Sequence, residues 1–289
     1  MVNFTVRLES QPRSWLCIPI CGRCTGELMV EPQSRITGGG LIVTGSSRGI
    51  GAEICRLAAQ RGWSVCVNYR NSHDEAAAVV DQIRTSGGVA VAVQADVSVE
   101  AEVSTMFDQV EQDFGPVKGL VNNAGVNGGG TRVDDLDADA SRRVFEVNVL
   151  GTFLCAKYAV KRMAKRHGGS GGVIVNVSSA ASKHGGPGTY TDYAASKGAI
   201  DTFTVGLAKE QAEEGIRVNC LRPGATMTEL SVDWAQQNPQ WLDWVIEQIP
   251  MRRPAQVEEV ARAAIFLLSD DSSYVTGATL DVCGGWVSP

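Results

Sequence analysis

The amino-acid sequence predicts an α/β fold, a doubly wound parallel β-sheet of about seven strands with helices on both faces. Short β-branched runs alternate with longer stretches in which apolar residues recur three and four positions apart. The runs are apolar at nearly every residue, which is typical of strands that are buried on both faces of a parallel sheet. We therefore expect a single Rossmann-like domain whose ligands bind beyond the carboxyl ends of the strands.

Each expected element follows from this alternation. The expected strands are the runs GLIVTG, SVCVNY, VAVAVQAD, VKGLVNNAG, GGVIVNVSS, IRVNCLRPG and ATLDV. The expected helices cover residues 49–61, 74–86, 99–113, 138–166, 192–214 and 256–269. Residues 1–37 show no such period, so we expect an irregular, disordered N-terminal extension before a Rossmann-like domain over 38–289.

Composition excludes several classes of protein. The chain has 289 residues, of which 44% are hydrophobic and 20% charged, as in ordinary globular proteins. Its net charge of −6 argues against unspecific binding to nucleic acid, because there is no basic surplus to neutralise phosphates. The apolar runs are far shorter than the ~20 residues that a membrane span needs. We expect no nucleic-acid or membrane partner.

The eight cysteines favour a reducing compartment, and we expect a cytoplasmic protein. Three of them, Cys17, Cys21 and Cys24, are crowded together, but a closed zinc site needs four ligands and no histidine lies near them in the sequence. We expect no metal. The other five stand singly in apolar or helical stretches, where we expect buried thiols: Cys55, Cys66, Cys155, Cys220 and Cys283.

A glycine-rich turn, TGSSRGIG, follows the first expected strand and leads into a helix. Gly45, Gly49 and Gly51 let the backbone turn tightly and approach a diphosphate, and the new helix offers free N–H groups to negative charge. A tight turn without a ligand is the alternative. The position of TGSSRGIG between the first expected strand and the first expected helix favours a dinucleotide-binding turn.

The end of the second expected strand bears on which dinucleotide binds. An acidic residue about 20 residues beyond the glycine turn would hydrogen-bond the ribose of NAD, and VNYRN has none. Arg70 and Arg48 instead offer guanidinium groups to a 2′-phosphate. We therefore expect NADP(H), with NAD(H) left open because surface arginines are commonly solvated.

A tyrosine and a lysine stand four residues apart at the start of a later expected helix. Side chains at this spacing share one helical face, so Tyr193 and Lys197 can approach the same ligand. A neighbouring positive charge lowers the pKa of a phenol, which makes it a usable general acid or base. The preceding strand delivers Ser178 and Ser179 to the same edge of the sheet. A half-buried ring beside a solvated charge is the alternative.

In this order and spacing, TGSSRGIG, NNAG, FEVNVLG, VNVSS, YAASK and LRPG resemble the motifs of the short-chain dehydrogenase/reductase family over about residues 38–289. The resemblance implies that Tyr193 is the catalytic acid/base and that Lys197 lowers its pKa and holds the nicotinamide ribose. It also implies that Ser179 binds the substrate oxygen and that Asn148 helps to hold a water for proton relay. The spacing from Ser179 to Tyr193 is one residue longer than is common in the family, which the Gly-Gly-Pro-Gly loop can absorb.

Two lesser candidates stay open in this region. Ser178 lies further still from the family spacing, and Tyr190 has no lysine four residues on. Trp234, Trp241 and Trp244, at roughly helical spacing, either cover a substrate pocket as a lid or pack as an aromatic stripe.

The residues and the resemblance together predict an NADP(H)-dependent oxidoreductase that interconverts a carbonyl and a secondary alcohol of a small molecule. The alternatives are an NAD(H)-dependent alcohol or sugar dehydrogenase of the same fold and a non-catalytic dinucleotide-binding sensor. The resemblance also implies a homotetramer or homodimer. The expected catalytic residues are Asn148, Ser179, Tyr193 and Lys197. The expected cofactor-binding residues are Gly45, Ser47, Arg48, Gly49, Ile50, Gly51, Tyr69, Arg70, Asp96, Val97, Asn123, Ala124, Gly125, Tyr193, Lys197, Pro223, Gly224, Thr226 and Thr228.

Overall fold

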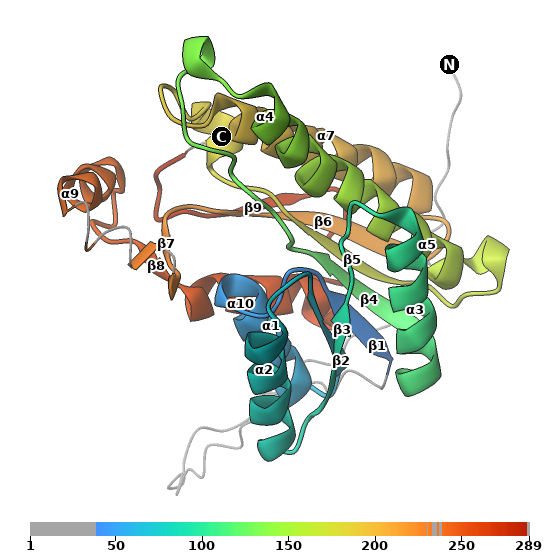
Figure 1. Cartoon of the computed structure of the whole chain (residues 1–289). Coiled ribbons are helices and arrows are strands. Elements are labelled where there is room, and N and C mark those ends of the chain that lie inside the picture. Colours follow the sequence, from blue (N-terminus) through green and yellow to red (C-terminus); the bar gives the residue numbers. More distant parts are fainter. Residues whose placement is uncertain (1–38, 230, 233–235, 237–238, 288–289) are drawn as a thin grey trace, which may run out of the picture. The chain divides into compact units, whose positions relative to one another are not determined.

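A seven-stranded parallel sheet lies at the centre of the computed structural model, which describes residues 39–229, 231–232, 236 and 239–287 (Figure 1). The strand order is β3-β2-β1-β4-β5-β6-β9, and each neighbouring pair is parallel. The predicted fold class is therefore confirmed. The strands are β1 (Gly40–Val43), β2 (Ser64–Tyr69), β3 (Val89–Gln94), β4 (Val117–Asn122), β5 (Gly172–Val177), β6 (Ile216–Pro223) and β9 (Thr279–Val282).

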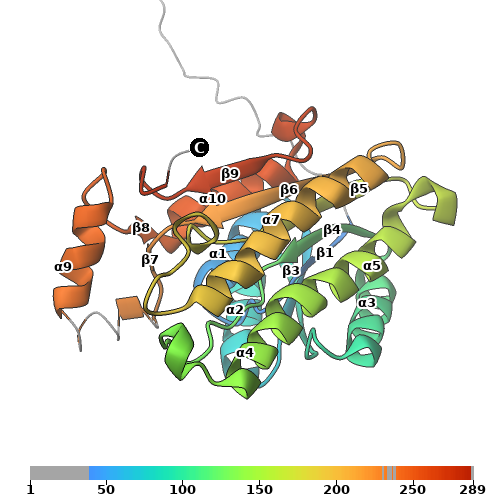
Figure 2. The ribbon, with the colours of Figure 1, turned by 90° about the horizontal axis from the view of Figure 1, so that it is seen from above.

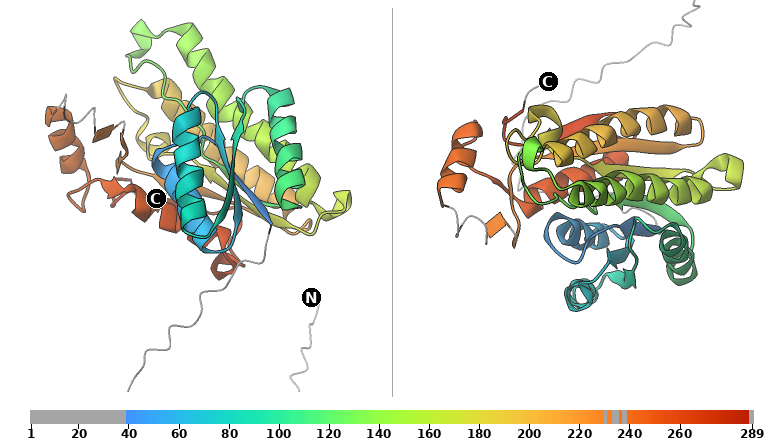
Figure 3. Two further views of the ribbon diagram at one scale, coloured as in Figure 1. Left: turned by 60° about the horizontal axis from the view of Figure 1, so that its bottom comes forward. Right: turned by 45° about the horizontal axis from the view of Figure 1, so that its top comes forward.

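Helices cover both faces of this sheet, as Figures 2 and 3 show. Side chains alternate along each strand, so Leu41 and Val43 of β1 join one apolar cluster and Ile42 joins the other. The first cluster includes residues of α1 (Gly49–Gln60), α2 (His73–Thr85) and α10 (Val257–Leu268). The second includes residues of α3 (Glu100–Phe114), α5 (Thr152–Met163) and α7 (Thr191–Gln211).

The helix predicted over 138–166 is present from Ala138 to Met163, but it is not α-helical throughout. The chain forms α4 (Ala138–Phe145), then a π-helical turn over Glu146–Gly151, then α5, and ends in a short 3₁₀ turn over Lys165–His167. The π turn widens the hydrogen-bonding pattern of the helix between α4 and α5. Asn148, an expected catalytic residue, lies inside this turn.

Several short elements have no counterpart in the sequence prediction. They are α6 (Ala181–His184), the paired two-residue strands β7 (Thr226–Met227) and β8 (Ala255–Gln256), α9 (Pro239–Gln248), and 3₁₀ turns over Val133–Asp135 and Asp270–Ser272. All of them fall within the connections that follow β4, β5 and β6, and only the turn over Asp270–Ser272 comes after the last helix of its connection. The region that would contact ligands is therefore more structured than the sequence pattern suggests.

The chain order positions a ligand crevice. From β1 the chain moves outward to β2 and β3, and it then returns to place β4 on the other side of β1. Connections leave in opposite directions at this switch point, which opens a crevice at the carboxyl ends of β1 and β4. The predicted extension over 1–37, with Cys17, Cys21 and Cys24, lies outside the described residues, so the boundary at 38 stays a prediction.

Candidate active site

The turn after β1 depends on glycine at two positions. Gly45 and Gly49 have φ angles of +59° and +57°, in the region that favours glycine. A Cβ at Gly45 would lie 2.8 Å from the Cα of Ala124, so the turn packs directly on the loop after β4. The first turn of α1 carries no acidic side chain, which leaves its free N–H groups available to an anion.

The loop after β4 is tied to this turn by side-chain hydrogen bonds. The backbone N–H groups of Asn123 and Ala124 both donate to the Thr44 hydroxyl at 3.0 Å. The Asn123 amide nitrogen donates to the carbonyl oxygens of Thr44 and Gly45, each at 2.9 Å. Asn123 therefore fixes the two loops against each other and uses both of its N–H donors in doing so.

Asn68, near the end of β2, fixes the other side of the turn. Its side chain is buried, accepts a hydrogen bond from the Gly45 backbone N–H at 3.1 Å, and donates to the carbonyls of Val93 and Ala95. One side chain thus joins the loops after β1 and β3. Asn68 was not expected from the sequence, although its position within VNYRN was the signal that could have found it.

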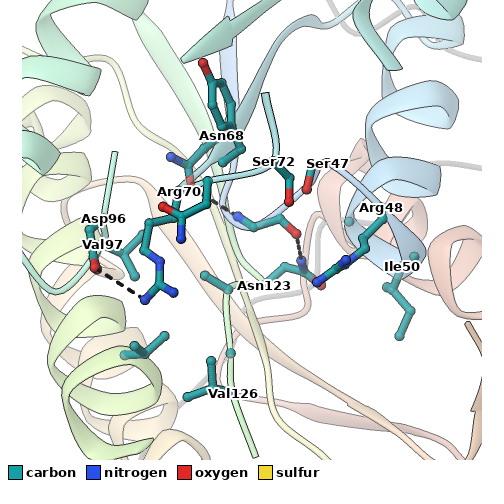
Figure 4. Close-up of a pocket in the computed structure, with 18 of the residues that line it drawn as sticks. Ser47, Arg48, Ile50, Asn68, Arg70, Ser72, Asp96, Val97, Asn123 and Val126 are labelled. Atoms are coloured by element: carbon teal, nitrogen blue, oxygen red, sulfur yellow. Dashed lines mark hydrogen bonds and ion pairs between the residues drawn. The ribbon is translucent and has the colours of Figure 1, made fainter. Parts of the chain in front are cut away.

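These loops enclose a cavity of about 440 Å³ at the carboxyl ends of β1 to β4 (Figure 4). Small-molecule and cofactor sites typically measure roughly 300–1,000 Å³. The expected cofactor residues that line it are Gly45, Ser47, Arg48, Gly49, Ile50, Gly51, Tyr69, Arg70, Asp96, Val97, Asn123, Ala124, Gly125 and Thr228. Its lining also includes residues that were not expected from the sequence: Asn68, Asn71, Ser72, Ala95, Val126, Arg143, Val147 and Glu229.

Five expected cofactor residues do not line this cavity: Tyr193, Lys197, Pro223, Gly224 and Thr226. The last three lie where the chain leaves β6, and the Gly224 backbone N–H donates to the Val282 carbonyl at 2.9 Å. A Cβ at Gly224 would lie 2.8 Å from the Cα of Cys283, so this turn packs closely on the end of β9. Thr228, a few residues on, reaches back toward Gly49.

The cavity residues fit a dinucleotide. The glycine turn lets a diphosphate approach the backbone, and the lining contains the cations Arg48, Arg70 and Arg143 against the anions Asp96 and Glu229. Arg70 stands at the end of β2, where the sequence predicts that it meets a 2′-phosphate. Asp96 stands after β3 as expected, but its carboxylate already accepts hydrogen bonds from Ser98 and Arg143.

Lys197 is almost fully buried, with 4% of its surface exposed. Its ammonium donates a 2.8 Å hydrogen bond to the Val177 carbonyl at the end of β5 and lies 5.7 Å from the centre of the Tyr193 ring. Burial lowers the pKa of Lys197 to about 8. The lysine and the tyrosine therefore share one face of α7, as the spacing predicts.

The pKa of Tyr193 departs from the expectation. Burial raises the pKa of the phenol, a hydrogen bond with Ser179 opposes this, and the net direction is upward. Lys197 is not among the groups that set this direction, so the lowering expected from the sequence stays a prediction. Tyr193 keeps its proton at neutral pH.

The two serines after β5 have different partners. The Ser178 hydroxyl is buried and donates to the backbone carbonyl of Lys197 at 3.1 Å, so it stabilises the start of α7. Ser179 accepts a hydrogen bond from the Ala181 N–H at 3.2 Å, and its hydroxyl acts to lower the pKa of the Tyr193 phenol. Of the two, Ser179 is the hydroxyl that lies beside the tyrosine.

Asn148 uses its whole amide group within the protein. Its oxygen accepts from the Val126 N–H at 2.8 Å, and its nitrogen donates to the Val126 carbonyl and to the Ser196 hydroxyl. Ser196 in turn donates to the Tyr193 carbonyl at 2.7 Å. The asparagine therefore links the loop after β4 to the first turn of α7.

Aromatic side chains of α6, α9 and the segment after β9 contact one another. The His184 ring stacks on Trp286 with 4.9 Å between centroids, and Trp286 meets Trp244 of α9 edge-on at 6.3 Å. Trp244 is 51% exposed, whereas its neighbour Val245 is buried, so α9 packs through Val245 and leaves about half of Trp244 in solvent. Trp234 and the Trp241 side chain lie outside the described residues. A lid role for this segment stays a prediction.

Other features bear on the expected partners. The five cysteines among the described residues are free and buried. Within the described ranges, no cluster of three histidine, cysteine or carboxylate side chains is arranged to hold a metal ion. In the same part of the chain, every helix is too short or too polar to cross a membrane.

Comparison with known proteins identifies the family. The family described as enoyl-(acyl carrier protein) reductase matches residues 45–287. The chain is 51% identical over 244 residues to an Escherichia coli protein named uncharacterized oxidoreductase YgfF, covering 84% of this chain and 98% of that one. It is 39% identical over 250 residues to glucose 1-dehydrogenase 2 of Bacillus subtilis, covering 86% and 95%.

A solved structure agrees with the sequence relatives. The chain superposes with a TM-score of 0.80 and 34% identity on a gluconate 5-dehydrogenase from Burkholderia cenocepacia in complex with NADP and tartrate. The match covers 87% of this chain and 96% of that one. The chain belongs to the short-chain dehydrogenase/reductase family and is an oxidoreductase of carbonyl and alcohol groups.

Proposed function

We propose that the protein is an NADP(H)-dependent oxidoreductase that reduces a small-molecule carbonyl to a secondary alcohol, and catalyses the reverse, with Tyr193 as the acid/base. The observation that carries the proposal is the meeting of Tyr193, Lys197 and Ser179 at the end of β5, next to the loop that lines the dinucleotide cavity. Gly125 of that loop supplies the link, since a Cβ there would lie 3.4 Å from the Lys197 ammonium.

The choice of NADP(H) rests on charge. Arg48 and Arg70 line the cavity, and the loop after β2 offers no carboxylate to a ribose hydroxyl. Guanidinium groups suit a phosphate monoester because they donate paired hydrogen bonds. The Burkholderia cenocepacia relative in complex with NADP supports the same choice. When bound, the cofactor supplies the hydride to the carbonyl carbon.

The chain's own groups handle the substrate oxygen. Ser179 donates a hydrogen bond to that oxygen, and Tyr193 gives it a proton as negative charge develops. The raised pKa of Tyr193 keeps the phenol protonated at neutral pH, which suits reduction. Lys197 then balances the charge left on the tyrosine, since the ammonium is held nearby by Val177.

In this proposal Asn148 holds other parts of the site in place. Its side chain braces the loop after β4 and the start of α7, and proton relay through a water would use the opened backbone of the π turn. The turn after β6, with Pro223, Gly224, Thr226 and Thr228, would border the nicotinamide end. Of these four, Thr228 reaches the cavity lining.

We also propose a homodimer or homotetramer. Exposed apolar side chains gather along the π turn, α5 and α7, and Phe153 of α5 stacks on Phe203 of α7 at 4.2 Å. Leu150 is 44% exposed and Val205 is 40% exposed, so a second copy would remove apolar surface from water. A cytoplasmic location is proposed from the five free, buried thiols.

The test is turnover of a panel of sugar, steroid, acyl-thioester and simple aromatic ketones with NADPH and with NADH, followed by nicotinamide absorbance. We expect reduction of at least one ketone with NADPH as the better donor. Tight dinucleotide binding without turnover of any ketone would favour the sensor. Faster turnover with NADH would overturn the proposed cofactor choice.

A further inference from the structure

Asp96 lies between two arginines at the wall of the dinucleotide cavity. The Arg143 Nη2 donates to the Asp96 Oδ2 at 2.6 Å, while the Arg70 Nη1 lies 3.8 Å from the same oxygen. Figure 4 shows the Arg70 side chain directed toward Asp96, with this ion pair dashed. The three charged groups come from different elements: Arg70 follows β2, Asp96 follows β3, and Arg143 lies on α4.

Arg143 holds the carboxylate more firmly than Arg70 does. The Arg143 Nη1 donates to the Ser98 hydroxyl at 2.7 Å, and the Ser98 N–H and hydroxyl donate to the Asp96 Oδ1 at 2.9 and 2.7 Å. Asp96, Ser98 and Arg143 thus form a closed set of charge-assisted hydrogen bonds. Both carboxylate oxygens have close donors before Arg70 is counted.

The state of Asp96 agrees with this geometry. Partial burial alone would raise its pKa, but the hydrogen bonds from Ser98 and Arg143 outweigh burial and lower the pKa below the ordinary range. Asp96 is therefore a carboxylate at neutral pH. An anion at this place would repel a nearby phosphate unless a cation balances it.

Arg70 is in a different situation. Its side chain is 52% exposed, and 3.8 Å is too long for a hydrogen bond to Asp96. Across the residues that the structure describes, its guanidinium donates no hydrogen bond to another side chain. It can therefore turn toward a ligand without breaking a strong contact.

We propose that Arg143 determines the preference for NADP(H). It pairs with the Asp96 carboxylate, so the Arg70 guanidinium stays available to bind the 2′-phosphate. This inference rests on the proposed cofactor. Arg143 is a positioning residue here, because it acts through Asp96 and Arg70. When Arg143 is removed, Asp96 becomes an unpaired anion beside Arg70, attracts that guanidinium, and competes with the phosphate for it.

The experiment measures the dissociation constants of NADPH and NADH for the full chain by titration calorimetry. The variants are Arg143→Gln, Asp96→Asn and the double variant. Arg142→Gln is the matched control, because Arg142 is the neighbouring arginine on α4 and pairs with Asp139 outside the cavity lining. We expect Arg143→Gln to weaken NADPH binding by about tenfold, the size of one charge-assisted contact, with little change for NADH.

The double variant separates this role from a structural one. With Asp96 neutralised, Arg70 has no carboxylate to turn to, so Arg143→Gln in the Asp96→Asn background should leave NADPH binding unchanged. Equal losses for NADPH and NADH, no loss, or the same loss in both backgrounds would overturn the inference. A native chain that binds NADPH no more tightly than NADH would reject the proposed cofactor choice, and the inference with it.

Discussion

The ammonium of Lys197 donates a 2.8 Å hydrogen bond to the backbone carbonyl of Val177, the last residue of β5. This contact fixes the lysine against the sheet, while Tyr193 stands one helical turn earlier on the same face of α7. Strand β5 therefore delivers Ser179 just beyond its end and anchors the lysine at its end. The proposed acid/base depends on this one junction of strand and helix.

Burial of Lys197 makes folding stability depend on pH. Its pKa is about 8 in the folded protein, below the ordinary value of 10.5, so the unfolded chain binds more protons between these values. Stability from this group therefore rises as pH increases through that window and is constant below it. Denaturant unfolding should be measured for the native chain and for Lys197→Met. The free energy of unfolding of the native chain should rise relative to that of Lys197→Met as pH increases from about 8 to 10.5. A difference that does not change with pH would contradict this.

Gly45→Ala should destabilise the protein and weaken dinucleotide binding. The φ of +59° and the 2.8 Å approach to Ala124 leave no room for a Cβ, and such strain costs about 1–3 kcal/mol. Gly206→Ala is the control, since a Cβ there meets nothing within 4 Å and α7 would gain helix propensity. Thermal unfolding of both variants checks this. If Gly45→Ala were as stable as the native chain, the claim that this turn requires glycine would be wrong.

Arg222 joins three elements through two ion pairs. Its guanidinium donates to Asp201 of α7 at 2.9 Å and to Asp281 of β9 at 2.7 Å, and its side chain is only 6% exposed. Arg222→Ala leaves two carboxylates without their cation and should cost about 3–5 kcal/mol.

Arg262→Ala provides the comparison, because the Arg262–Glu258 pair is exposed and such pairs contribute about 0–1 kcal/mol. Urea unfolding should show a larger loss of unfolding free energy for Arg222→Ala than for Arg262→Ala. Similar unfolding free energies would show that the Arg222 network does not stabilise the fold.

Val205→Glu should disrupt the proposed oligomer without unfolding the subunit. Val205 is 40% exposed on α7, so a carboxylate there would be solvated in a single subunit but buried against a second copy. Val89, which is 52% exposed on the edge strand β3, gives the control variant Val89→Glu. Light scattering should report a smaller mass for the first variant alone. An unchanged mass for Val205→Glu would contradict an interface at this part of α7.

The parallel sheet was predictable because its strands are apolar at nearly every position, and buried strands such as β5 leave a strong local pattern. The interruption at Asn148 was not predictable, since a π turn arises from one extra residue and leaves the apolar spacing of α4 and α5 almost intact.

The site shows the same division. Tyr193 and Lys197 lie four residues apart on a helix, so their proximity can be predicted from the sequence spacing alone. Arg143 and Asp96 are 47 positions apart and meet only after folding. The pKa of Tyr193 could not be predicted either, because burial sets its direction and depends on the whole fold.

The central claim is that the Tyr193 phenol transfers the proton, and the most direct test compares turnover of the native chain, Tyr193→Phe and Tyr190→Phe. Tyr190 is the matched control, since its ring lies 5.9 Å from that of Tyr193 and no lysine follows it by four residues. We predict that Tyr193→Phe lowers kcat by about 10²–10⁴-fold while NADPH still binds, and that Tyr190→Phe retains most activity. Native turnover by Tyr193→Phe would contradict the account.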